Sequence, residues 1–132
     1  MEEEKSPMTG MTQEEKDEYV MGKAMDIIMG SGDARLHASK AMDHIAKGEL
    51  DEAKAELKEA DKLQAEAHNV QTEMIQGDIR GGDEKMGIYV LFAHAQDIRM
   101  TIQVEINMTK SMLKIAKNYE KRLADLEAKV QG

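Results

Sequence analysis

The 132-residue sequence contains no cysteine, which excludes both a disulfide framework and a metal site built on thiolates. Its single proline is Pro7, so no helix breaker other than glycine occurs after that point. Aromatic residues are scarce as well, with no Trp, one Phe and three Tyr. Apolar burial must therefore come mainly from Ala, Leu, Ile, Val and Met, a composition that favours closely packed helices over a β-sandwich.

No apolar run approaches the length of a membrane-spanning helix, and the opening MEEEKSPMTG lacks the segments of a secretory signal. We therefore expect a soluble, cytoplasmic protein without membrane insertion. The formal net charge is −8, and residues 1–18 hold seven acids against two bases. Such a chain does not fit nucleic-acid binding, which requires basic clusters. One basic stripe is interpreted as a solvated helix face: Lys110, Lys114, Lys117 and Lys121.

Glycines divide the chain into three predicted helices, at about residues 14–47, 49–77 and 83–130. Asp83 is the predicted N-cap of the third helix. Short connections between helices favour an all-α fold, an antiparallel up-down three-helix bundle. We expect residues 15–132 to form this single domain, preceded by a polar, acidic and flexible arm over residues 1–14.

Each predicted helix carries an apolar repeat with alternating steps of four and three residues, typical of helices packed side by side. The seam of the first helix comprises Val20, Ala24, Ile27, Ser31, Ala34, Ala38, Ala41 and Ile45. The seam of the second comprises Leu50, Ala53, Leu57, Ala60, Leu63, Ala67, Val70 and Met74.

The third helix has two such seams. Its core seam comprises Leu91, Ala95, Ile98, Ile102, Glu105, Thr109, Met112, Ala116, Tyr119, Leu123, Leu126 and Val130. Its second seam comprises Val90, His94, Asp97, Thr101, Val104, Met108, Ser111 and Ile115. A lone bundle requires only one apolar face on each helix, so the second seam predicts packing against other subunits. We expect an oligomer assembled through the third helix.

Three polar residues of the segment FAHAQDIRM are candidates for a site. His94 and Asp97 lie one helical turn apart on the second seam, and around a symmetry axis the repeated Asp97 carboxylates would repel unless protons or a cation intervened. Oxygen ligands favour a hard ion such as Mg²⁺ or Ca²⁺. The alternative places Asp97 at an exposed edge. Gln96 points away from His94 on its own helix, so it would assist the histidine of a neighbouring subunit.

An imidazole is the leading candidate for covalent chemistry, because the chain has no cysteine, GxSxG elbow or GxxxxGK loop. The alternative for His94 is a hydrogen-bonded core residue. His37 and His44 lie roughly 10 Å apart by helix rise, too far to share an ion, and are interpreted as surface or boundary residues. A di-iron bundle is excluded because paired Glu-x-x-His ligands are missing.

The chain resembles the lactose/cellobiose-type IIA components of the bacterial sugar phosphotransferase system, a family that includes the diacetylchitobiose component. The resemblance runs from about Tyr19 to Leu126. It is carried by IIMGSGDAR at 27–35, KGELDEAKAEL at 47–57, EAHNVQTEMIQGD at 66–78, and HAQD followed by Met100 and Thr101.

The resemblance implies a homotrimer of three-helix subunits that acts as a phosphocarrier. His94 would accept a phosphoryl group on its tele nitrogen from the histidine-containing phosphocarrier protein and pass it to a cysteine of the IIB component. Asp97 would lie at the trimer axis beside Mg²⁺ or another divalent cation, and Gln96 beside the active site. The membrane IIC component binds the sugar in this family, and no organic cofactor is implied.

One departure from the family pattern is the loss of its second histidine, which is Ile98 here and is followed by Arg99. The core seam places Ile98 inside the subunit, where an apolar residue packs well. The alternative function is therefore a trimeric helical scaffold or regulator that has kept the fold and lost phosphotransfer.

Overall fold

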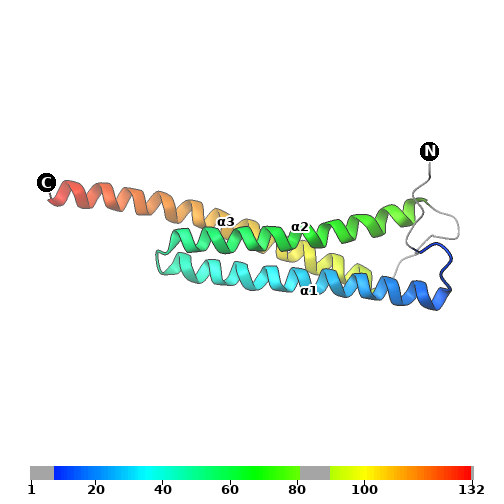
Figure 1. Ribbon diagram of the computed structural model, residues 1–132. Helices are drawn as coiled ribbons and strands as arrows, with labels where there is room; N and C mark the ends of the chain where they lie inside the picture. The colour runs from blue at the N-terminus through cyan, green and yellow to red at the C-terminus, as the bar shows by residue number, and fades with distance from the viewer. Residues whose placement is uncertain (1–7, 81–89, 132) are drawn as a thin grey trace.

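The computed structural model describes residues 8–80 and 90–131, which form three long helices and no strand. The helices are α1 (Gln13–Ala46), α2 (Leu50–Arg80) and α3 (Val90–Gln131). They lie side by side and run up, down and up, with α3 continuing past the turn that joins α1 to α2 (Figure 1). The predicted antiparallel three-helix bundle is confirmed. None of the described helices is long and apolar enough to cross a membrane.

The two ends of α1 follow from local hydrogen bonding. Thr12 caps the first turn by accepting from the Glu15 amide at 3.2 Å, while the Glu15 carboxylate accepts from the Thr12 amide at 2.9 Å. At the other end Gly48 has φ +75°, the left-handed conformation that stops a helix. The Glu49 amide then donates to the carbonyl of His44 at 2.8 Å, and α2 begins at the next residue.

The amino-terminal arm and the end of the second helix differ from prediction. Met8 is 2% exposed and packs in a core cluster with Val20 and Ala24, so the described part of the arm is held against the bundle. Residues 1–7 lie outside the described residues, as does the predicted N-cap Asp83. Gly77 does not end the second helix, because α2 continues to Arg80. A glycine costs a helix only about 1 kcal/mol.

The core follows the predicted seams of α1 and α2 closely. All of the predicted α1 seam is buried except Ile45, which packs partly buried against the core. In α2 the predicted seam is buried at six positions and partly buried at Leu63 and Val70. Many of these side chains are alanines, and their small volume lets the helix axes approach closely.

The core seam of α3 is only partly correct. Its members Ala95, Ile102 and Thr109 are buried, but the seam missed three other residues of α3 that are buried too: Phe92, Ile106 and Leu113. Glu105, assigned to that seam, instead lies at the surface and pairs with Arg35 of α1 at 2.8 Å. An α-helix repeats every 3.6 residues, so a strict seven-residue repeat drifts away from the buried face along a long helix.

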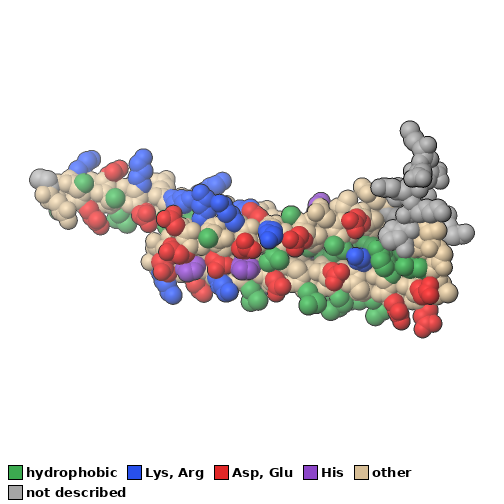
Figure 2. All heavy atoms as spheres, in the orientation of Figure 1, with side chains coloured by type: hydrophobic (Ala, Val, Ile, Leu, Met, Phe, Trp, Pro, Cys, Tyr) green, Lys and Arg blue, Asp and Glu red, His purple; other side chains and the backbone are tan. Residues whose placement is uncertain are grey.

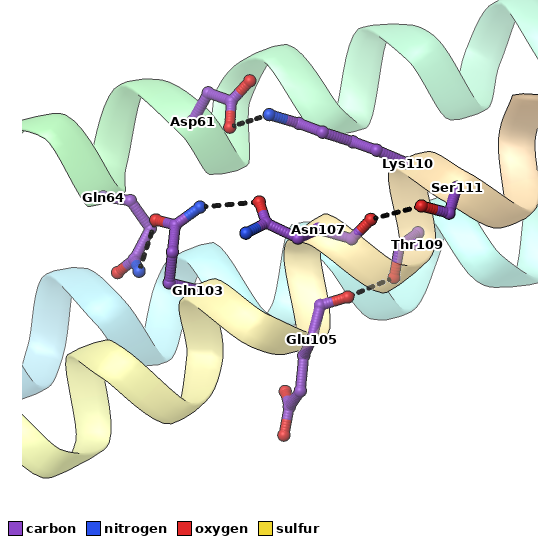
Figure 3. A network of polar contacts seen from close by, with 8 residues as sticks. All are labelled: Asp61, Gln64, Gln103, Glu105, Asn107, Thr109, Lys110 and Ser111. Carbon is purple, nitrogen blue, oxygen red and sulfur yellow. Dashed lines mark hydrogen bonds and ion pairs between the residues drawn. The ribbon is translucent and has the colours of Figure 1, made fainter.

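Polar side chains join α2 to α3 along one side of the bundle (Figure 3). Gln64 is 3% exposed, and its amide nitrogen donates to the Arg99 carbonyl at 2.9 Å and to Gln103 Oε1 at 3.2 Å. Further along, Lys110 Nζ lies 2.7 Å from the Asp61 carboxylate. Directional bonds of this kind fix how far α3 slides along α2, which apolar contacts alone specify weakly.

Two histidines lie at the boundary between α1 and α2, as expected. His37 contacts Glu56, and His44 Nδ1 lies 3.2 Å from Glu49. The hydrogen bond from His37 holds the pKa of Glu56 below its usual range, helped by the charges of His37, Lys40 and His44. Because the folded-state pKa is lowered, this contact stabilises the fold at pH values above the ordinary glutamate pKa of about 4.3. The contribution is lost as the pH falls through the folded-state pKa.

We expect Glu56→Gln to lower the free energy of unfolding by less than about 1 kcal/mol at pH 6, because the pair is partly exposed. At pH 3, where the carboxyl group is increasingly protonated, the difference from the parent protein shrinks. Urea unfolding of both proteins at the two pH values measures this. An equal difference at pH 6 and pH 3 contradicts the assignment.

Candidate functional site

His94 lies near the start of α3, next to two residues that anchor this part of the helix. Phe92 and Ala95 are 8% and 0% exposed and belong to the same core cluster as Met8 and Val20. His94 itself is exposed, and within the described residues it forms no hydrogen bond or ion pair. The reading of His94 as a hydrogen-bonded core residue is therefore wrong for the single chain. The imidazole is presented to solvent by a helix whose neighbouring residues are anchored in the core.

The other two predicted site residues are separated by the geometry of α3. Asp97 is exposed one turn beyond His94 on the second seam, and Gln96 is half-buried on a different side of the helix. A single chain thus brings His94 and Asp97 onto one face but keeps Gln96 apart from them. Within the described residues, no group of three potential ligands could hold a metal ion in a single chain.

The second seam forms an exposed face along α3 that combines apolar and polar side chains. Val90, Val104, Met108 and Ile115 are between 50% and 87% exposed. Part of this face is a depression of about 300 Å³ lined by Val104, Asn107, Met108, Ser111 and Met112. Large apolar side chains exposed on one face of a helix are typical of an interaction surface.

The segment that follows His94 is tied to the second helix by residues that sequence reasoning did not assign. Arg99 Nε donates to Gln71 Oε1 at 2.5 Å, which joins the turn of α3 just after the HAQD motif to the EAHNVQT motif of α2. Ile98, which replaces the second histidine of the family pattern, packs partly buried against the core. An apolar residue is favoured at that position, as expected. Arg99 and Gln71 lie 28 positions apart, so their pairing could not be predicted from the sequence.

A further apolar surface, not anticipated from the sequence, lies along the outer edge of α1, where Figure 2 shows hydrophobic side chains gathered. Met21, Met25, Met29 and Leu36 are 44% to 63% exposed there. The sequence feature that could have predicted this surface is the four-residue spacing of Met21, Met25 and Met29. Flexible thioether side chains adapt to different surfaces and are common where proteins dock.

The sequence of the chain is similar to that of a known protein family. The family model described as PTS system, Lactose/Cellobiose specific IIA subunit, matches residues 22–117. The N,N'-diacetylchitobiose-specific EIIA component of Escherichia coli K12 is 33% identical over 109 residues, covering 83% of this chain and 89% of the relative. The lactose-specific EIIA component of Lacticaseibacillus casei is 31% identical, covering 78% and 87%.

Two solved structures resemble the fold. The cellobiose-specific enzyme IIA of Bacillus anthracis superposes with a TM-score of 0.70 at 32% identity, covering 84% of this chain and 94% of that one. The chitobiose IIA of Escherichia coli, solved in complex with HPr, superposes with a TM-score of 0.68 at 29% identity, covering 76% and 96%.

A three-helix bundle that presents an HAQD histidine on its last helix defines the protein as a IIA-type component of the sugar phosphotransferase system. Within that class, the chain belongs to the lactose/cellobiose-specific IIA family.

Proposed function

We propose that the protein is a phosphocarrier that accepts a phosphoryl group on His94 from the histidine-containing phosphocarrier protein, HPr, and passes it to a cysteine of a IIB component. The single observation that carries this proposal is the exposed imidazole within HAQD, which forms no hydrogen bond or ion pair with the other described residues, in a chain that belongs to the IIA family. A related chitobiose IIA has been solved with HPr, which supports the choice of donor. The transfer serves uptake of a lactose-, cellobiose- or chitobiose-type disaccharide bound by a membrane IIC component.

The proposed transfer consists of two displacements at phosphorus. The neutral tele nitrogen of His94 attacks the phosphoryl group on HPr, so a nitrogen–phosphorus bond forms here as the one on the donor histidine breaks. The IIB thiolate then attacks, forming a sulfur–phosphorus bond and releasing the imidazole. Exposure of His94 suits both steps, because two different proteins must reach the same nitrogen.

The proposed active form is a homotrimer in which the Asp97 side of three α3 helices meets at the axis, while His94, one turn away, lies at the open edge of this interface in a cleft between adjacent subunits. This arrangement covers the exposed apolar side chains of that face and brings three Asp97 carboxylates together. Carboxylate oxygens fit Mg²⁺ or another hard divalent cation, which would neutralise their repulsion. Gln96 of a neighbouring subunit would donate its amide to the phosphoryl oxygens on His94.

The test of the phosphocarrier role is the intact mass of the protein after incubation with phosphoenolpyruvate, enzyme I and HPr. We expect one acid-labile phosphoryl group per chain. Absence of any gain would favour the alternative function, a scaffold or regulator that lost phosphotransfer together with the histidine now replaced by Ile98.

We expect Asp97→Leu to raise the melting temperature of the oligomer by roughly 5 °C, because three repelling carboxylates become apolar contacts at the axis. We also expect EDTA to change the melting temperature of the parent protein but not that of the variant. Asp33→Leu, at an exposed position of α1, is the matched control and should change neither property. If Asp97→Leu behaves like this control, Asp97 lies at an exposed edge and not at an axis.

A further inference from the structure

In the part of the chain that the structure describes, the last part of α3 buries no side chain, and Tyr119 and Leu123 only line an open depression of about 480 Å³ beside Ile45 and Leu50. The match to the family ends at residue 117, but α3 continues to Gln131. The segment 118–131, here called the α3 extension, projects past the turn between α1 and α2 (Figure 1). Every residue of the extension is exposed, and the last buried residue of α3 is Leu113.

The α3 extension nevertheless carries an apolar seam. Tyr119, Leu123, Leu126 and Val130 follow steps of four, three and four residues and are 56% to 85% exposed. Upstream, the same repeat continues through Met112 and Ala116. This spacing corresponds to the a and d positions of a heptad, with Leu123 and Val130 at a and Tyr119 and Leu126 at d. Most of the stability of a helix in a protein comes from packing of its apolar face. The exposed seam therefore indicates that another helix packs against the extension.

The charges that flank this seam specify the orientation of the partner. Glu120 and Glu127 occupy e positions, whereas Arg122 and Lys129 occupy g positions. Within the described residues none of the four forms an ion pair, and Arg122 lies over its own Tyr119 ring at 5.6 Å. In a parallel, in-register assembly Arg122 of one copy meets Glu127 of the next. An antiparallel assembly would bring glutamates against glutamates and bases against bases.

The extension is also continuous with the exposed face of α3. Met108 and Ile115 of the second seam lie on the side of the helix that Tyr119 and Leu126 continue. A copy of α3 packed against the second seam therefore reaches the extension without changing direction. The neighbouring α3 therefore matches the extension in sequence, charge pattern and position.

We propose that the α3 extension forms a parallel, in-register coiled coil with the same segment of the two other copies in the assembly. This proposal rests on the homotrimer of the proposed function for the number of strands. The coiled coil holds the three α3 helices together at the end of the molecule opposite to His94 (Figure 1). Association is then secured by residues that take no part in phosphotransfer.

The absence of cysteine allows a direct test in the full chain. Leu126→Cys places one thiol per copy at a d position, so mild oxidation should link most chains in disulfide-bonded pairs. The matched control is Ala128→Cys, an exposed position on the opposite side of the helix, which should remain unlinked. No cross-linking of Leu126→Cys, or equal cross-linking of the control, overturns the proposal.

A charge exchange tests the register. Arg122→Glu should weaken association about tenfold, because each predicted pair becomes a repulsion. Adding Glu127→Arg should restore association to within about twofold of the parent protein. The predicted pairing is overturned if the double variant associates as weakly as the single variant, or if the single variant associates as strongly as the parent protein. Both variants leave His94 in place, so the phosphoryl mass gain tests the phosphocarrier role separately. Cross-linking without phosphorylation would refute only that role.

Discussion

We expect His94→Gln to abolish phosphorylation by phosphoenolpyruvate, enzyme I and HPr completely. Glutamine has a similar size and polarity, but its amide cannot attack phosphorus, and the described residues show no second imidazole on the exposed face of α3. The melting temperature should stay at the parent value, because the side chain is exposed and makes no contact that the fold requires. Intact mass and thermal unfolding measure the two effects.

The matched control for this variant is His44→Gln, which alters a half-buried histidine at the α1–α2 boundary. It should gain one phosphoryl group per chain as the parent protein does. Phosphorylation that survives in His94→Gln but disappears in His44→Gln would move the acceptor to α1. A large loss of stability in His94→Gln with normal phosphorylation would assign His94 a structural role.

The largest expected effect on stability comes from Ile102→Ala. Ile102 is 0% exposed and belongs to the core cluster of all three helices, so its truncation removes buried apolar contacts and leaves a cavity. We expect the free energy of unfolding to fall by about 2–5 kcal/mol. Urea unfolding at one fixed protein concentration measures the change, because the stability of an oligomer depends on concentration.

Leu36→Ala is the control for that experiment, since Leu36 is 60% exposed on α1. We expect its effect to be within about 0.5 kcal/mol. An Ile102 variant as stable as the Leu36 variant would contradict the placement of Ile102 in the core.

The seams show how far periodicity predicts a core. In α1 the prediction was nearly complete, because a run of small and apolar residues from Val20 to Ala41 faces both other helices. In α3 the same reasoning misassigned Glu105 and missed Phe92 and Ile106. A helix with apolar residues on two sides presents several plausible stripes, and only the position of its neighbours decides which of them is covered.

The candidate site was found by different reasoning for each residue. His94 and Asp97 could be placed together because residues three apart share a helix face, and the structure keeps both on the exposed side of α3. Arg99 and Gln71 could not be paired from the sequence, since α2 and α3 bring them together across 28 positions. The outer edge of α1 was missed because its methionines were counted as core composition.

The sequence by itself determined the helical class, the number and direction of the helices, the buried face of α1 and α2, and the histidine that carries the proposed chemistry. These features depend on composition, on spacing within one helix, and on a motif, all of which are local. The tertiary structure decided the buried face of α3, the burial of Met8 and the partners of Gln64. Each of these depends on which residues of other elements lie opposite, and spacing along one helix carries no such information.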